Sequence, residues 1–228
     1  MITKNNNDSY EIMIQTISFQ RVVPQVFTSQ GDLQSHVWQQ EDLTFERGHL
    51  YLVEADSGSG KSTFCSYILG YRHDYEGKIL FDGQDIRRLK VADWTRLRQQ
   101  EFSYLFQELR LFPELTAYEN VEIKNCLTHH QERSVIEGWF EQLGIADKLN
   151  ARVGLMSYGQ QQRVAMIRAL CQPFSFILVD EPISHLDDQN AAAMAQIMME
   201  EARRQEAGVI VTSIGKRMPL DYEQTYRL

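Results

Sequence analysis

The sequence predicts an α/β fold whose main sheet is parallel. Three short apolar runs, at residues 50–53, 176–179 and 209–212, are typical of strands that are buried on both faces. A helical pattern follows the first run at 62–69, and another separates the second run from the third at 188–207. Because strands that alternate with helices pack into parallel sheets covered by helices, this order favours an α/β core.

The first third of the chain adds strands on both sides of the first helix. Residues 11–19 are rich in Ile and Phe, which predicts a strand. The run 50–53 ends in a turn rich in Gly and Ser, so a strand, a turn and a helix follow one another. Residues 78–81 form a further strand, because Asp82 and Gly83 after them are typical of a tight turn.

The last third of the chain has the clearest boundaries. Pro173 and Pro182 flank the run 176–179, as expected for a strand that ends on both sides. The helix expected at 188–207 begins with an Asp and is followed by Gly208, which are typical start and stop residues.

The middle of the chain has a mostly helical pattern from about 86 to 149, interrupted by Pro113 and Gly144. This pattern predicts a helical subdomain inserted into the core. We expect a single domain over 1–228, with residues 1–85 and 165–228 as the core and about 86–164 as the helical subdomain.

Composition excludes several classes of protein. Apolar residues make up 43% and charged residues 24% of the chain, which excludes a disordered or collagen-like protein. The net charge is −8, from 23 basic and 31 acidic residues, so nucleic acid is not expected as a partner. No apolar run is long enough to span a bilayer.

The cysteines and the amino-terminal residues point to a reducing compartment. Cys65, Cys126 and Cys171 are scattered and odd in number, so they form neither a disulfide framework nor a metal motif. Residues 1–8 are polar and lack the apolar stretch of an export signal. We therefore expect a cytoplasmic location.

The strongest local motif is Ser-Gly-Ser-Gly-Lys-Ser-Thr at 57–63, between a strand and a helix. Its glycines let successive backbone N–H groups point inward, and the helix amino terminus adds positive potential. Lys61 can reach the β- and γ-phosphates of a nucleotide, and the Ser62 hydroxyl can ligate Mg²⁺. Ala55 stands where the usual pattern has a glycine. The expected phosphate-binding residues are Ala55, Asp56, Ser57, Gly58, Ser59, Gly60, Lys61, Ser62 and Thr63.

Three further motifs follow in a fixed order. They are Met-Ser-Tyr-Gly-Gln-Gln-Gln-Arg at 156–163, Phe-Ile-Leu-Val-Asp-Glu-Pro at 176–182 and Ser-His-Leu-Asp at 184–187. With the loop at 57–63, this arrangement resembles the ATP-binding cassette (ABC) ATPases over about residues 12–212. The resemblance implies a P-loop NTPase core with a mostly parallel sheet, an N-terminal antiparallel β portion and a helical subdomain, with ATP and Mg²⁺ as cofactors.

The resemblance also implies roles for three residues at the γ-phosphate. Asp180 resembles the carboxylate that supports Mg²⁺, and Glu181 resembles the general base that polarises the attacking water. Gln107, in Tyr-Leu-Phe-Gln-Glu at 104–108, resembles the glutamine that senses Mg²⁺ and the γ-phosphate.

The motif at 156–163 resembles the family signature, which closes over a nucleotide held by the opposite subunit. Ser157, Gly159 and Gln160 are then nucleotide-binding residues at a helix amino terminus, which favours an anion. Tyr158 stands where the family usually has glycine, so its side chain is expected to point away from the nucleotide. Asp187 resembles the aspartate that bridges the two subunits, and His185 is interpreted as a surface-loop residue.

Two further positions bear on nucleotide binding and turnover. Phe27 is the candidate for stacking on adenine, with a place in the core as the alternative. Ser213 stands where the family has a histidine that contacts the γ-phosphate. Loss of one positioned electrostatic contact commonly lowers a rate by about 10²–10³, so slow hydrolysis is expected.

The motif details are most similar to the lipoprotein-release and macrolide-export ATPases and the FtsE group. The resemblance implies a homodimer or a heterodimer with another ABC ATPase, a transmembrane permease-type partner, and a peripheral location on the inner face of the cell membrane. Two functions stay open: an ATPase that drives transport, and a nucleotide-dependent binding module with little hydrolysis. A soluble ABC protein acting on DNA or ribosomes is disfavoured by the acidic balance.

Overall fold

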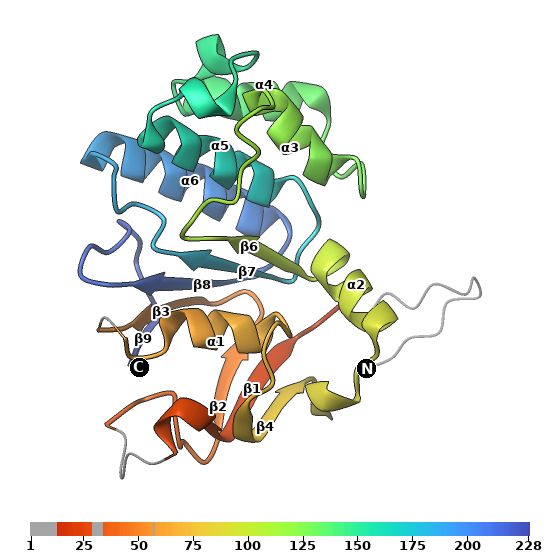
Figure 1. The fold of residues 1–228 in the computed structure, drawn as a ribbon, viewed down its shortest axis with the longest axis vertical. Helices are drawn as coiled ribbons and strands as arrows, with labels where there is room; N and C mark the ends of the chain where they lie inside the picture. The colour runs from red at the N-terminus through yellow and green to blue at the C-terminus, as the bar shows by residue number, and fades with distance from the viewer. Residues whose placement is uncertain (1–12, 29–33, 57) are drawn as a thin grey trace.

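The computed structural model describes residues 13–28, 34–56 and 58–228. Its main sheet has the strand order β6-β7-β8-β3-β9, and all its neighbouring strands are parallel (Figure 1). The predicted α/β fold with a mostly parallel sheet is confirmed. The strands are β3 (Leu50–Glu54), β6 (Phe102–Leu105), β7 (Phe176–Asp180), β8 (Gly208–Ser213) and β9 (Gln224–Arg227).

A second sheet is antiparallel and has the order β2-β1-β4-β5. This sheet is the expected N-terminal antiparallel portion. The strand predicted at 11–19 begins at Thr16 within the described residues, while residues 11 and 12 lie outside them. The strands are β1 (Thr16–Pro24), β2 (Leu43–Glu46), β4 (Tyr75–Phe81) and β5 (Gln84–Asp85).

The helices cover both faces of the parallel sheet (Figure 1). Helix α1 (Lys61–Ile68) lies between the two sheets, and α5 (Tyr158–Leu170) and α6 (Asp188–Arg204) cover the opposite face. The remaining α-helices are α2 (Val91–Gln100), α3 (Ala117–Asn125) and α4 (Arg133–Gln142). Short 3₁₀ turns occur at Gln25–Phe27, Ile86–Arg88, Ala146–Lys148 and Val153–Leu155.

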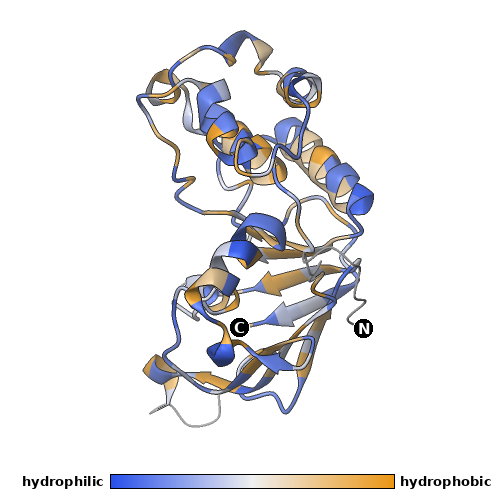
Figure 2. Cartoon of the chain, turned by 90° about the vertical axis from the view of Figure 1, so that its right-hand side faces the viewer, coloured by the Kyte–Doolittle hydropathy of each residue, from blue (hydrophilic) through white to orange (hydrophobic). Residues whose placement is uncertain are grey.

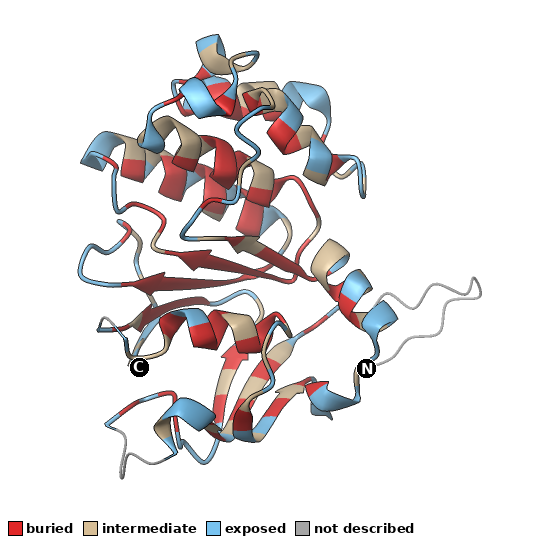
Figure 3. Cartoon of the chain, viewed as in Figure 1, coloured by how far each residue is buried: buried red, intermediate tan, exposed pale blue. Residues whose placement is uncertain are grey.

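Two hydrophobic clusters, one on each side of the parallel sheet, follow from the alternation of side chains along a strand. In β7, Ile177 and Val179 face the cluster beneath α5 and α6, whereas Phe176 and Leu178 face the cluster around α1. Every residue of β7 and β8 is buried, as the red central strands in Figure 3 show. In Figure 2, orange hydrophobic residues colour much of the strands in the middle of the molecule, whereas the helices alternate between blue and orange along their length.

The strand β6 departs from the helical pattern that was expected between 86 and 149. It is only four residues long and includes two polar residues, so its sequence carries little strand signal. The Ser103 hydroxyl donates to the Ala169 carbonyl at 2.5 Å, which satisfies this buried polar group.

Among the described residues, no helix is long and apolar enough to cross a membrane.

Candidate functional site

The loop between β3 and α1 is shaped by two glycines with left-handed backbones. The φ angles of Gly58 and Gly60 are +87° and +99°, a region that favours glycine. Gly60 also lacks space for a side chain, because a Cβ there would lie 3.1 Å from the Phe27 ring and 3.4 Å from the Trp38 ring. Phe27, the candidate for adenine stacking, therefore lies against the start of α1.

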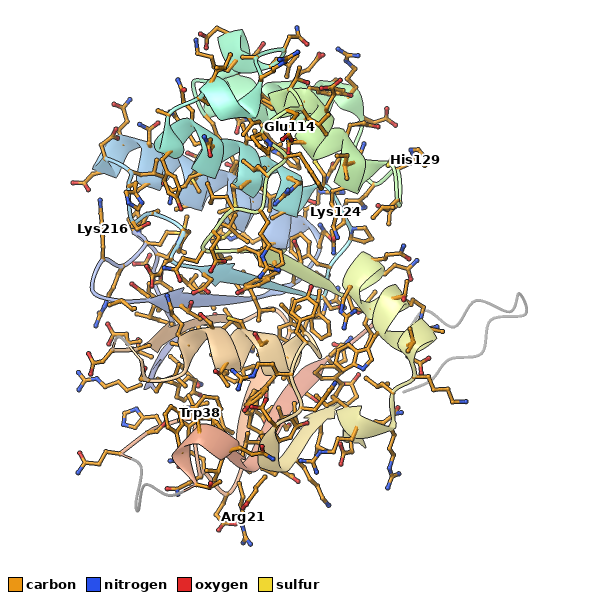
Figure 4. The ribbon with its side chains drawn as sticks, viewed as in Figure 1. Arg21, Trp38, Glu114, Lys124, His129 and Lys216 are labelled. Atoms are coloured by element: carbon orange, nitrogen blue, oxygen red, sulfur yellow. The ribbon has the colours of Figure 1, made fainter. Side chains whose placement is uncertain are left out.

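The first half of this loop is held by hydrogen bonds. Ser59 donates to the Asp56 carbonyl from its backbone N–H at 3.1 Å and from its hydroxyl at 2.9 Å. The indole N–H of Trp38, labelled in Figure 4, donates to the Ser59 carbonyl at 3.3 Å. Ala55 is buried and donates its N–H to the Ser213 carbonyl at 3.1 Å. Ser57 lies outside the described residues.

Lys61 brings together groups from three elements. Its Nζ lies 3.1 Å from Asp180 Oδ1 at the end of β7, forms an ion pair with Glu181, and lies 3.5 Å from Gln107 Oε1 in the loop after β6. The Lys61 side chain is only 6% exposed. Gln107 Nε2 also donates to Glu181 Oε2 at 3.4 Å. The structure thus places four of the expected residues within one hydrogen-bonded group.

The Asp180 carboxylate is buried and fixed by two hydroxyl donors. Thr212 Oγ1 donates to Oδ1 at 2.5 Å, and Tyr104 Oη donates to Oδ2 at 3.2 Å. Burial, with the negative charge of Asp180 nearby, raises the pKa of Tyr104, which keeps this phenol protonated as a donor. No sequence motif indicates Thr212 and Tyr104 as partners of Asp180, because these two residues lie on neighbouring strands that are far from Asp180 in sequence.

Glu181 follows β7 in a strained conformation. Its φ is +48°, and its N–H donates to the Thr212 carbonyl at 3.1 Å. Left-handed backbones outside glycine are concentrated at functional sites, where surrounding contacts hold them. The backbone therefore turns sharply at the residue expected to act as the base.

The two hydroxyl residues at the start of α1 differ in their surroundings. Ser62 is exposed, whereas Thr63 is buried and its hydroxyl accepts a hydrogen bond from Arg72 at 3.0 Å. The described residues contain no cluster of three or more His, Cys, Asp or Glu side chains placed to bind a metal. The oxygen donors of Ser62, Gln107 and Asp180 are of the hard type that fits Mg²⁺, which commonly takes further ligands from phosphate and water.

The signature residues form the first turn of α5. The Ser157 hydroxyl accepts from Gln160 N at 3.3 Å, and Gln160 Oε1 accepts from Ser157 N at 2.9 Å, so the two residues form a capping box. A Cβ on Gly159 would lie 3.1 Å from Leu186 Cδ2, so glycine allows close packing there. Tyr158 Oη donates to the Gln107 carbonyl at 3.0 Å.

Asp187 caps α6 and Ser213 ends β8. Asp187 accepts hydrogen bonds from the Asn190 backbone N–H at 2.8 Å and from Asn190 Nδ2 at 2.7 Å. The hydrogen bond from the Asn190 backbone is the main cause that lowers the pKa of Asp187. Ser213 is 2% exposed, and its hydroxyl donates to the Lys216 carbonyl at 2.6 Å. The hydroxyl proton of Ser213 is therefore engaged within its own turn.

A comparison of the sequence with protein-family models agrees with this site. The family model described as "ABC transporter" matches residues 38–184, more than half of the chain. The chain belongs to the ABC transporter ATP-binding family. The family is one of ATP-binding ATPase cassettes of transporter complexes, so the resemblance inferred from the motifs is confirmed.

Two named relatives illustrate the similarity. An uncharacterized ABC transporter ATP-binding protein, YclH of Bacillus subtilis (strain 168), is 31% identical over 181 residues, which are 78% of this chain and 79% of the relative. The macrolide export ATP-binding/permease protein MacB of Shewanella sp. (strain W3-18-1) is 33% identical over 186 residues, 80% of this chain. The chain spans only 29% of the length of that relative.

The fold is also that of solved cassettes. The dimeric structure of MJ0796, a bacterial ABC transporter cassette, superposes with a TM-score of 0.68 and 24% identity, covering 86% of this chain and 87% of that chain. A bacterial Atm1-family ABC exporter with ATP bound superposes with a TM-score of 0.70 and 20% identity over 92% of this chain and 36% of that chain.

Proposed function

We propose that this ABC cassette binds ATP with Mg²⁺ at a head-to-tail dimer interface and couples binding and hydrolysis to a separate transmembrane partner. The observation that carries the proposal is the buried Lys61 ammonium, which contacts Asp180, Glu181 and Gln107 beside a glycine-shaped loop. A buried cation at a helix amino terminus, next to two carboxylates and an amide, is the charge pattern that phosphoryl transfer requires.

Each residue has a separate role in this proposal. Lys61 and the N–H groups of the loop bind the phosphates, and Ser157 on the opposite chain closes over them. In the nucleotide-free chain Glu181 accepts hydrogen bonds from Gln107 and Lys61. Once these two residues turn to Mg²⁺ and the phosphates, the Glu181 carboxylate is released to take a proton from water. Asp180, Ser62 and Gln107 would hold Mg²⁺, which neutralises phosphate charge when bound.

A second function, a nucleotide-dependent binding module with little hydrolysis, is favoured by the surroundings of Ser213. Its short side chain carries no positive charge, and its hydroxyl proton is donated to the Lys216 carbonyl at 2.6 Å. Binding and catalysis are separable, because only contacts that are stronger in the transition state accelerate chemistry.

The transmembrane partner is supported by the names of the relatives and by one exposed aromatic side chain. Residues after Gln107 divide between core and surface: Leu109 is 4% exposed, whereas Phe112 is 49% exposed. An exposed phenylalanine beside the helical part of the chain suits a contact with a permease-type protein on the inner face of the membrane. A permease of this kind would bring two cassettes together.

The test is nucleotide-driven dimerisation of Glu181→Gln, which keeps the shape of the side chain and removes its charge. With saturating ATP and Mg²⁺, sedimentation should show a stable dimer for this variant and a monomer without nucleotide. The matched control is Glu137→Gln, an exposed glutamate on α4 that pairs with Arg133. A Glu181→Gln protein that binds ATP and stays monomeric, alone and with its permease, would contradict the proposal.

A further inference from the structure

The first turn of α5 is joined to the loop after β6 by Tyr158, which stands at a position usually occupied by glycine in this family. Tyr158 Oη donates to the Gln107 carbonyl at 3.0 Å. The Tyr158 ring also meets the His185 ring edge-on, with centroids 4.5 Å apart and planes at 66°. The Tyr158 side chain therefore links α5 to two loops. One is the loop after β6 that carries Gln107, here called the Gln107 loop (residues 106–110), and the other is the loop before α6.

A second contact joins α5 to the same loop farther along the helix. Arg168 donates from Nη1 to the Arg110 carbonyl at 2.7 Å and from Nη2 to the Leu109 carbonyl. Burial lowers the pKa of Arg168 to about 10. Because Arg168 lies about 15 Å along the helix from Tyr158, the two contacts fix the orientation of the loop as well as its position.

The backbone between these contacts is in a conformation that requires external support. Leu109 and Arg110 have φ angles of +59° and +48°, and neither is glycine. Two successive left-handed residues of this kind persist only where their surroundings hold them. The guanidinium of Arg168, directed at the carbonyls of the same two residues, is such a support.

We propose that Tyr158 and Arg168 are positioning residues that make the Gln107 loop move together with α5. Gln107 Oε1 lies 3.5 Å from Lys61 Nζ, and Gln107 Nε2 lies 3.4 Å from Glu181 Oε2. Any displacement of the α5 amino terminus, which carries Ser157, is then transmitted to the groups around Lys61. The consequence for turnover rests on the proposed function, whereas the link itself is a property of the unliganded chain.

Hydrogen exchange of the nucleotide-free protein tests the link. Tyr158→Phe keeps the ring and removes only the hydroxyl that donates to Gln107. Loss of one ordinary hydrogen bond should accelerate exchange of the amides at 107–110 by about 2- to 10-fold, with the thermal midpoint nearly unchanged. The matched control is Tyr71→Phe, because Tyr71 is 48% exposed and its hydroxyl has no hydrogen bond among the residues that the structure describes.

Two further measurements separate positioning from packing. Arg168→Lys keeps the charge and removes the forked donor pair, so it should accelerate exchange in the same segment. In ATPase assays, Tyr158→Phe should lower kcat and leave KM nearly unchanged, because Gln107 would be misplaced for the reaction while Lys61 stays in place. The proposal would be overturned if the amides at 107–110 exchanged as slowly in Tyr158→Phe as in the wild type. It would also be overturned if exchange in Tyr158→Phe became faster while kcat stayed unchanged. The exchange measurement uses no nucleotide, so it remains decisive even where ATP binding fails.

Discussion

Replacement of Lys61 by methionine should destabilise the nucleotide-free protein as well as abolish ATP binding. Lys61 Nζ is 3.1 Å from Asp180 Oδ1 and also pairs with Glu181, and the exposed fractions of these three side chains are 6%, 2% and 15%. Removing one partner of a buried ion pair typically costs about 3–5 kcal/mol, because it leaves an uncompensated buried charge.

The lower end of that range is expected here. Asp180 keeps its hydrogen bonds from Thr212 and Tyr104 in the variant. A loss of about 3 kcal/mol corresponds to a fall in Tm of roughly 6–12 °C for a domain of this size. The assay is thermal unfolding followed by circular dichroism without nucleotide.

Lys216→Met is the control for that measurement. Lys216, labelled at the edge of the molecule in Figure 4, has its Nζ 3.4 Å from Asp188 Oδ1 and donates to the Leu186 carbonyl at 2.7 Å. The Lys216 side chain is 45% exposed and that of Asp188 is 99% exposed, so the loss of this ion pair and of one hydrogen bond should stay below about 1.5 kcal/mol. Saturating ATP should raise the Tm of the control and leave that of Lys61→Met unchanged. Equal Tm values for the two variants without ATP would refute the reasoning.

Three further predictions concern turnover, docking and pH. Ser213→His should raise kcat for ATP by up to about 10²–10³, at a stability cost of about 1–3 kcal/mol because the site is buried; unchanged steady-state turnover would argue against it. Phe112→Glu should abolish association with permease-containing membranes while changing the unfolding free energy by less than about 0.5 kcal/mol, and a large loss of stability would instead assign Phe112 to the core. Burial opposes ionisation of Glu201, but hydrogen bonds from His130, Arg204 and Gln205 outweigh it and lower the pKa of Glu201. Its stabilising contribution is therefore present above the ordinary glutamate pKa of 4.5 and is lost as pH falls through the lower folded-state value; urea unfolding between pH 3 and 7 should show a weaker acid dependence for Glu201→Gln.

The buried strands and the phosphate loop were predictable because their signals are local. The apolar run 176–179 and the helix that follows at Asp188–Arg204 need no long-range information. The four-residue strand β6 and the edge strand β9 were missed, because their short and partly polar sequences become strands only by pairing with β7 and β3.

The residues of the site also divide into those that a local motif predicts and those that only the fold brings together. Lys61, Asp180 and Glu181 belong to contiguous motifs, and their types indicate their chemistry. The hydroxyl groups of Tyr104 and Thr212 belong to neighbouring strands, and only the register of the sheet brings them to Asp180. The contacts of Tyr158 and Arg168 with the Gln107 loop likewise depend on how α5 lies over β6.

The left-handed backbone of Glu181 sets local strain against the ion pair that its side chain forms with Lys61. A non-glycine residue at a φ of +48° is less stable than glycine there by about 1–2 kcal/mol. Glycine would relieve this strain but would also remove one partner of the buried ion pair with Lys61, which typically costs about 3–5 kcal/mol. Selection for thermal stability alone, without a screen for activity, should therefore retain a carboxylate at position 181.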